Sequence, residues 1–201
     1  MIGRGSFGDV FKGILTPTNG KGEIAVAIKR IAGLKYKNIL GLKQQLNNER
    51  RCLEHLKSDN ITRLLAYAET KNNMYFVLEL CNGGTLGELI ACRPNKKLKE
   101  EEVRVVFRQV AEALTVLHEL DYCHRDMKLE NILIDIHSQG ATQGSDETVT
   151  NQFKATMPIT RDTVTVKICD LGLVREHNDK QSFLKSFKGT EPYMAPEIHE
   201  R

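Results

Sequence analysis

Apolar and polar positions alternate along much of the first eighty residues, which is the period of a β-strand buried on one face. The strand-like stretches are residues 2–15, 23–31 and 74–80. In the second of them, Ile24, Val26 and Ile28 fall on one face. Glycines interrupt the first stretch and the sequence CNGG ends the third, so we predict a strand-rich region up to residue 80.

Residues 39–56 change to a helical period. Four leucines of this segment share one stripe of the predicted helix, namely Leu42, Leu46, Leu53 and Leu56. Glu49 lies in the middle of that stripe, where an unpaired carboxylate would be costly to bury. We propose Lys29, at the end of the strand motif VAIK, as its partner. The alternative is that Glu49 sits at the edge of the stripe and reaches water.

The second half of the chain is mainly helical in pattern, with a few short strands. Residues 100–118 carry apolar side chains at helical spacing: Val103, Val106, Phe107, Val110, Leu114 and Leu117. Three glutamates at 100–102 suit the positive N-terminal end of this helix. The stretches ILID after residue 131 and TVTVKIC at 163–169 read as strands, and 136–163 reads as a long polar surface loop.

These patterns predict an α+β fold with two lobes. Residues 1–80 form a strand-rich lobe with one helix, and residues 81–201 form a mainly helical lobe with 136–163 as an insertion. A hinge near residues 79–83 joins them.

Composition and charge are those of an ordinary globular protein. The 201 residues are 40% hydrophobic and 27% charged, with a formal net charge of +3 and both signs interspersed. This weak charge gives no support to nucleic-acid or membrane binding, and no apolar stretch is long enough to span a bilayer. The five cysteines are odd in number and scattered, which favours free thiols in a reducing compartment, with the cytosol as the expected location.

The glycine-rich stretch GRGSFGDV, residues 3–10, is a candidate phosphate-binding loop. Gly3, Gly5 and Gly8 let backbone N–H groups approach a polyphosphate closely, and Val10 offers an apolar face to a base. A plain glycine-rich hairpin is the alternative. Because strand rather than helix follows, a Rossmann fingerprint is disfavoured.

The stretch HRDMKLEN, residues 124–131, gathers groups suited to phosphoryl transfer. Asp126 can accept the proton of an attacking hydroxyl, Lys128 can neutralise charge on the phosphoryl group, and Asn131 can offer an amide oxygen to Mg²⁺. Asp170 ends a predicted strand in the sequence DLG, either as a simple β-turn residue or as the principal Mg²⁺ carboxylate.

The motifs, in their order along the chain, are the glycine loop, VAIK, the helix glutamate, HRDMKLEN, DLG and GTEPYMAPE at 189–197. These motifs and their order strongly resemble the eukaryotic protein kinase family. The resemblance covers nearly the whole chain and implies ATP and Mg²⁺ as cofactors. It implies that Ala27 and Leu133 sandwich the adenine, that Leu78 is the gatekeeper, and that the backbone of Glu79 to Cys81 binds the adenine edge. It further implies that Lys29 pairs with Glu49, that Asp126 and Lys128 act in catalysis, and that Asn131 and Asp170 hold the metal.

Two features are similar to the serine/threonine branch: Lys128 two places after Asp126, and the GT-x-x-Y-MAPE pattern. The resemblance then implies protein substrates with serine or threonine hydroxyls, and Thr190 in contact with Asp126. Ser186 lies where many relatives carry an activating phosphate, with Arg125 as its partner. CNGG and the insertion are somewhat similar to the Unc-51-like kinases.

Departures from the family pattern also shape the expectations. Leu171 replaces the usual Phe and is expected to pack beneath the helix that carries Glu49. The chain begins at the glycine loop and stops just past APE, so we expect a truncated kinase whose 103–117 helix exposes apolar surface. One rival function is an inactive fragment acting as a nucleotide-binding or regulatory module. Another, a small-molecule kinase, is disfavoured by GTEPYMAPE.

Overall fold

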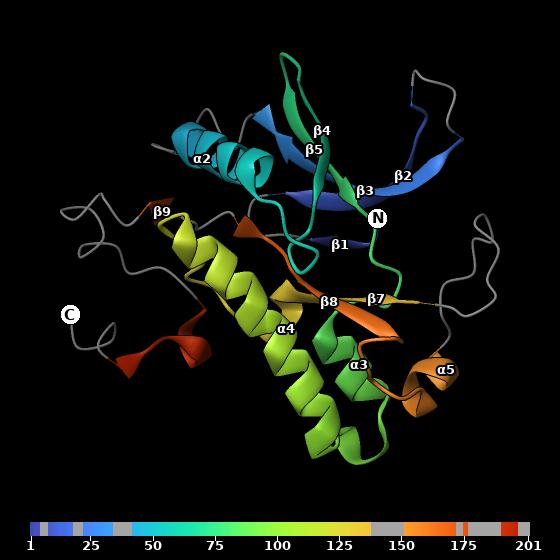
Figure 1. The fold of residues 1–201 in the computed structure, drawn as a ribbon. Helices are drawn as coiled ribbons and strands as arrows, with labels where there is room; N and C mark the ends of the chain where they lie inside the picture. The colour runs from blue at the N-terminus through green and yellow to red at the C-terminus, as the bar shows by residue number, and fades with distance from the viewer. Residues whose placement is uncertain are drawn as a thin grey trace.

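The computed structural model describes residues 1–4, 8–17, 22–33, 42–137, 151–171, 175–176 and 190–196. Its first part is a five-stranded antiparallel sheet with the strand order β1-β2-β3-β5-β4 (Figure 1). The strands are β1 (Gly3–Arg4), β2 (Asp9–Leu15), β3 (Ile24–Ala32), β4 (Leu64–Glu69) and β5 (Asn73–Glu79). The strand-rich region predicted from the alternation is therefore present.

The burial of β3 differs from the expected single apolar face. Val26 is fully buried, but Ile24 at the start of the strand is 46% exposed and Ile28 is half-buried. The opposite face carries the buried Lys29 and Ile31. Burial changes face along the strand because Ile31 packs in the core that the next helix covers.

That helix, α2 (Leu42–His55), confirms the leucine stripe. Leu42, Leu46 and Leu53 are buried in one hydrophobic cluster, and Leu56 packs against that cluster from just beyond the helix. Glu49 is buried within the stripe, at 3% exposure. Leu171 belongs to the same cluster and is 1% exposed, as expected for a residue packed beneath this helix.

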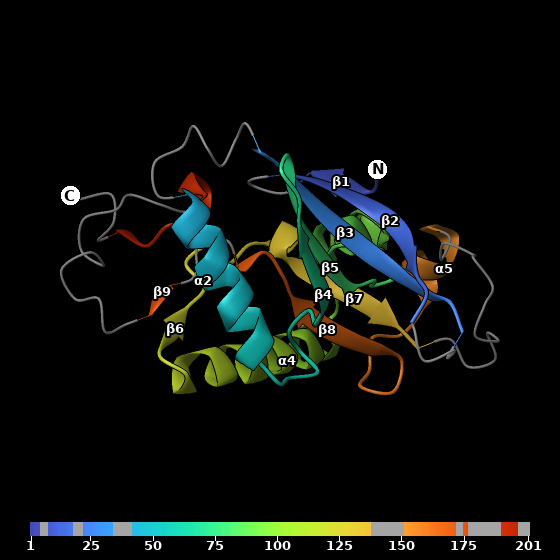
Figure 2. The same cartoon turned by 90° about the horizontal axis from the view of Figure 1, so that it is seen from above.

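The rest of the described chain is built on helices and two small antiparallel pairs of strands (Figures 1 and 2). The helices are α3 (Leu86–Cys92), α4 (Glu100–Glu119) and α5 (Asn151–Thr156). The strands are β6 (Tyr122–Cys123) with β9 (Arg175–Glu176), and β7 (Ile132–Ile136) with β8 (Val164–Ile168). Short 3-10 turns lie at η1 (Pro94–Lys96), η2 (Leu129–Asn131) and η4 (Glu191–Tyr193).

Helix α4 follows the predicted helical spacing, but not every predicted position is buried. Val106 and Leu117 are buried, whereas Phe107 is 70% exposed. Buried polar residues Glu102 and Gln109 share the covered face. These two side chains form specific polar contacts with neighbouring segments. Because the buried face of α4 therefore includes polar residues, the spacing of apolar residues alone does not predict which face is buried.

The prediction of a polar surface loop at 136–163 is wrong for its described ends. Ile136 belongs to β7, and α5 at residues 151–156 packs beside α3. Met157 and Ile159 are buried in the second hydrophobic cluster. The Arg93 side chain donates hydrogen bonds to the carbonyl oxygens of Ala155 (3.3 Å) and Met157 (2.7 Å). The segment after residue 150 is therefore part of the packed helical region.

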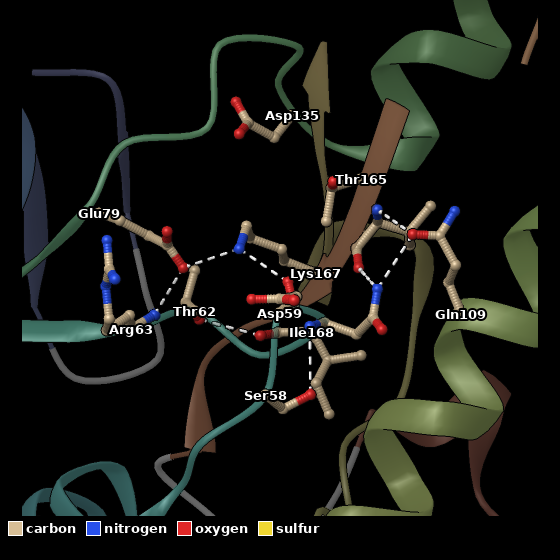
Figure 3. A network of polar contacts seen from close by, with 12 residues as sticks. Ser58, Asp59, Thr62, Arg63, Glu79, Gln109, Asp135, Thr165, Lys167 and Ile168 are labelled. Atoms are coloured by element: carbon tan, nitrogen blue, oxygen red, sulfur yellow. Dashed lines mark hydrogen bonds and ion pairs between the residues drawn. The ribbon is translucent and has the colours of Figure 1, made fainter. Parts of the chain in front are cut away.

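The connection between α2 and β4 binds the two parts of the fold together (Figure 3). The amide of Thr62 donates to the carbonyl of Ile168 (3.0 Å), and the amide of Ile168 donates to the carbonyl of Asn60 (2.9 Å). The Gln109 Oε1 atom accepts from the Asn60 amide group (3.0 Å) and from the Val166 backbone (2.9 Å). Strand β8 is therefore held along both edges: β7 pairs with one edge, and residues 60–62 bond to the other.

Two expectations about the chain as a whole can be compared with the structure. All five cysteines are free, as their number and spacing predict. In the part of the chain that the structure describes, no helix has both the length and the apolar character needed to cross a membrane.

Candidate active site

Three charged side chains from distant parts of the chain meet at the buried end of Lys29. Lys29 lies on β3, Glu49 on α2, and Asp170 just after β8. The Lys29 Nζ atom is 2.7 Å from Glu49 Oε1 and 2.8 Å from Asp170 Oδ1. The ion pair predicted between Lys29 and Glu49 is thus present, and the alternative in which Glu49 reaches water is excluded by its burial.

The charges of this cluster stabilise one another. Burial by itself lowers the pKa of Lys29, but the negative charges of Glu49 and Asp170 more than reverse this, so the pKa is raised and the ammonium is retained. Burial raises the pKa of Glu49, and the Lys29 ammonium opposes that rise. The Glu49 Oε2 atom is buried without a hydrogen-bond partner among the described residues. One ammonium therefore holds two carboxylates: Glu49, from the middle of the leucine stripe, and Asp170, from the segment after β8.

A second cluster is built around Asp126, in the segment between α4 and β7. Its Oδ1 atom accepts a hydrogen bond from Thr190 Oγ1 (2.6 Å), and its Oδ2 atom lies 2.9 Å from Lys128 Nζ. The Asn131 amide nitrogen donates to Asp126 Oδ2 (3.1 Å) and to the Asp126 carbonyl (2.7 Å). Lys128 also donates to Thr190 Oγ1 (2.7 Å), so the expected contact of Thr190 with Asp126 is present and is shared with Lys128.

These donors keep Asp126 ionised. Burial by itself raises the pKa of this carboxyl, which is 6% exposed, but hydrogen bonds from Thr190, Lys128 and Asn131 outweigh burial and the pKa is lowered. Both side-chain hydrogen bonds of Asn131 come from its amide nitrogen, so its side-chain carbonyl oxygen is the atom that suits a cation.

Backbone contacts join the two clusters. The amide of Cys169, the residue before Asp170, donates to the carbonyl of Asn131 (2.9 Å) and extends the β7–β8 pairing. Two residues here have a left-handed backbone: Arg125 with φ 63° and Asp170 with φ 57°. Because such a conformation is costly for residues other than glycine, the surrounding contacts must hold it in place.

His124 is a positioning residue that the sequence reasoning did not single out. Its Nε2 atom is 3.0 Å from the carbonyl of Cys169, and its Nδ1 atom accepts from the amide of Asp126 (3.3 Å). This pattern fits the neutral ring with the proton on Nε2, and burial lowers the pKa of His124, which favours the same form. The one feature of the sequence that could have identified His124 is its place directly before Arg125 and Asp126.

Strands β1 and β2, at the two ends of the glycine-rich stretch, pair antiparallel, with Gly3 opposite Val10. A side chain at Gly3 would meet open space, whereas one at Gly8 would collide with the carbonyl of Arg30. Gly8 is therefore required by the close approach of β2 and β3, a reason that differs from the predicted approach to phosphates. Gly5 and the regulatory candidate Ser186 lie outside the described residues.

The nucleotide-facing apolar candidates lie on facing parts of the fold. Val10 and Ala27 are half-buried on neighbouring strands of the five-stranded sheet, and Leu133 is half-buried on β7 beyond the hinge. Figure 1 shows the β7–β8 pair beneath that sheet. Ala27 pairs directly with Leu78 of β5, the predicted gatekeeper.

Behind the hinge, the Glu79 side chain takes part in a polar network (Figure 3). Its Oε1 atom is 3.1 Å from Lys167 Nζ and accepts from the amide of Arg63 (2.8 Å). Lys167 also donates to the carbonyl of Asp59 (2.7 Å). Because the carboxylate points to this network, only the backbone of Glu79 is left for the predicted contact with adenine. Cys81, two residues on, is half-buried, and burial raises the pKa of its thiol.

Comparisons with known proteins agree with this arrangement. The family model of the protein kinase domain matches residues 1–201. The chain is 31% identical to human serine/threonine-protein kinase ULK1 over 198 residues, 31% to bovine serine/threonine-protein kinase 33 over 199, and 33% to Arabidopsis thaliana mitogen-activated protein kinase kinase kinase 1 over 207. These alignments cover 98%, 98% and 100% of this chain but only 16%, 36% and 27% of the relatives.

The similar identities do not separate one subgroup from another, so the likeness to the Unc-51-like kinases stays a prediction. The match of the whole chain to the family model, together with relatives that are serine/threonine kinases, is decisive at the level of the family. The chain belongs to the protein kinase family.

Proposed function

We propose that this chain transfers the γ-phosphate of ATP to serine or threonine hydroxyls of protein substrates. The observation that carries the proposal is the environment of Asp126. This carboxylate is nearly buried, held ionised by three donors, and lies beside the ammonium of Lys128. A positioned carboxylate with a neighbouring cation is what a hydroxyl needs to lose its proton while it attacks a phosphorus atom.

Each charged residue of the two clusters then has a role. Asp126 orients the acceptor hydroxyl and takes its proton, and Lys128 stabilises the negative charge that develops nearby. Lys29, held by Glu49, supplies a fixed ammonium for phosphate oxygens. Thr190 keeps Asp126 and Lys128 in a common geometry, since its hydroxyl bonds to both.

The residues present fit a magnesium nucleotide. Asp170 offers a carboxylate and Asn131 an amide oxygen, which are hard ligands of the kind Mg²⁺ takes when it also binds phosphates. Among the described residues, no group of three or more His, Cys, Asp or Glu side chains gathers as a metal site. When bound, ATP supplies the phosphoryl group and Mg²⁺ offsets its charge. The proposed nucleotide contacts are Gly3, Gly8, Val10, Ala27, Leu133 and the backbone of Glu79 to Cys81.

We infer a reducing, cytosolic compartment for the protein. All five cysteines are free, and burial raises the pKa of Cys169, which lies beside Asp170, to about 12. A thiol protonated in this way stays inert next to the catalytic groups.

Transfer of label from γ-labelled ATP to casein, followed by identification of the labelled amino acid, tests the proposed function. We expect label on serine or threonine that requires Mg²⁺. Asp126→Asn keeps the shape of the side chain but removes the proton acceptor, so the rate should fall by about 10²–10⁴-fold. Absence of labelled serine and threonine with the unaltered chain, or an unchanged rate in Asp126→Asn, would contradict the proposal.

A further inference from the structure

Helix α2 has a second line of contacts, distinct from its leucine stripe. Lys43 and Arg50 are seven residues apart, which places them on one face of the helix two turns from each other. The Lys43 Nζ atom lies 3.7 Å from Glu69, and the Arg50 guanidinium lies 5.0 Å from the centre of the Tyr67 ring. Tyr67 and Glu69 are two residues apart on β4 and share one face of that strand. The same face of α2 is thus attached to β4 at two points.

The contact between Arg50 and Tyr67 continues inward to Lys29. Tyr67, Phe76 and Lys29 lie directly opposite one another on β4, β5 and β3, so they form one row across the sheet. The Tyr67 and Phe76 rings meet edge to face, with centres 5.4 Å apart and planes at 75°. The Lys29 ammonium lies 6.0 Å from the centre of the fully buried Phe76 ring. A continuous row therefore leads from the guanidinium of Arg50 to the ammonium that Glu49 must reach.

We propose that Arg50 and Tyr67 are positioning residues that fix α2 where Glu49 meets Lys29. Leucine contacts resist separation of the helix from the sheet, but they are non-directional and constrain its rotation poorly. Arg50 directly follows Glu49, so a guanidinium stacked on a fixed ring sets the rotation of this turn of the helix. Its Nη1 atom lies 3.8 Å from Glu54 Oε1 on the same helix, a half-exposed pair, whereas its Nε atom is buried without a hydrogen-bond partner among the described residues and depends on packing and the ring contact.

This inference rests on the proposed function, because the position of Glu49 matters most if Lys29 binds phosphates. Its test uses Arg50→Gln, which removes the cation, and Arg50→Lys, which keeps it. Arg51→Gln is the matched control, since it removes the same charge from the next, exposed position of α2. Tyr67→Leu removes the ring, and because it breaks the same contact, combining it with Arg50→Gln should add little.

The first measurement is the rate at which an acetylating reagent labels Lys29 in the protein without nucleotide, followed by mass spectrometry. Lys29 is 4% exposed where it pairs with Glu49, so the reagent reaches its amine only when this turn of α2 moves away from the sheet. Lys29 should therefore be labelled about three- to tenfold faster in Arg50→Gln and in Tyr67→Leu, and at an intermediate rate in Arg50→Lys. Arg51→Gln should match the unaltered chain. Lys167, which is paired with Glu79, is the internal control with a constant rate.

The second measurement is kcat for phosphate transfer in the background of Glu49→Gln. As a single substitution, Arg50→Gln should lower kcat about three- to tenfold. When it is added to Glu49→Gln, it should lower kcat by less than about twofold. Lys29 labelling that is the same in Arg50→Gln and Arg51→Gln, or an equal loss of kcat in both backgrounds, would overturn the inference. Failure of the proposed function is a separate result: the unaltered chain would transfer no phosphate, whatever the labelling showed.

Discussion

At the scale of single residues, Asp126 owes its charge to its neighbours. A carboxyl group as buried as this one would bind a proton more readily without donors around it. Among those donors, the hydroxyl of Thr190 lowers the pKa of Asp126 most, and it also accepts a hydrogen bond from Lys128. The hydroxyl therefore serves two functions: it lowers the pKa of Asp126, and it keeps the Lys128 ammonium beside the carboxylate.

Replacing Thr190 by Val tests both functions, because Val has nearly the same shape but no hydroxyl. The pKa of Asp126 should rise when this donor is lost. The base is active only when ionised, so the acidic limb of the pH–rate profile should move to higher pH, and kcat should fall about tenfold.

The control for this prediction is Thr190→Ser, which retains the hydroxyl and should keep the profile in place. The profile is measured as kcat for casein phosphorylation between pH 5 and pH 8. An acidic limb at the same pH in the Val and Ser variants would show that the Thr190 hydroxyl does not control the ionisation of Asp126.

Sequence reasoning located the residues whose patterns are unusual and missed those whose role depends on the fold. Glu49 was identifiable because an acid in a leucine stripe demands a partner, and Lys29 is that partner at 2.7 Å. His124 gave no comparable signal, since its two contacts to Cys169 and Asp126 exist only once β8 lies beside this segment. The requirement for glycine at position 8 is likewise set by a strand neighbour, Arg30.

At the scale of elements, α5 and the residues after it were the main error. The helix has only six residues, too few to give a clear helical period, and the surrounding sequence is polar. What holds the segment is a buried ion pair: Arg93 Nη2 lies 3.2 Å from Glu102 Oε1 and also donates to the carbonyl of Met157. Contacts of this kind join α3, α4 and residues 155–157. They link residues far apart in the sequence, so no local sequence pattern predicts them.

Arg93→Met should therefore destabilise the protein strongly. It leaves the Glu102 carboxylate buried without its cation, which costs about 3–5 kcal/mol of the free energy of unfolding. Adding Glu102→Gln removes the unpaired charge and keeps an acceptor for the amide of Lys99, so the double variant should recover part of the loss. Urea unfolding followed by circular dichroism measures both. A double variant less stable than Arg93→Met would show that the pairing of the two charges is unimportant.

At the scale of the whole molecule, residues 20 to 141 positions apart in sequence are brought to one place by three segments. The five-stranded sheet supplies Lys29, α2 supplies Glu49, and the β7–β8 pair places Asn131 and Asp170 at its end (Figure 1). The order of the motifs along the chain predicted this meeting through the family resemblance. Their spacing alone could not, because it carries no information on how the sheet lies relative to β8.

The central claim is that Lys29 and Asp126 serve one bound ATP, with Lys29 holding its phosphate oxygens and Asp126 taking the proton of the attacking hydroxyl. The most direct test is kcat/KM for ATP in Lys29→Arg, which keeps a positive charge between Glu49 and Asp170 but replaces the compact ammonium by a larger, planar group. With folding checked by circular dichroism, the account predicts a loss of about 10²–10³-fold. A folded Lys29→Arg protein that phosphorylates casein as efficiently as the unaltered chain would contradict it.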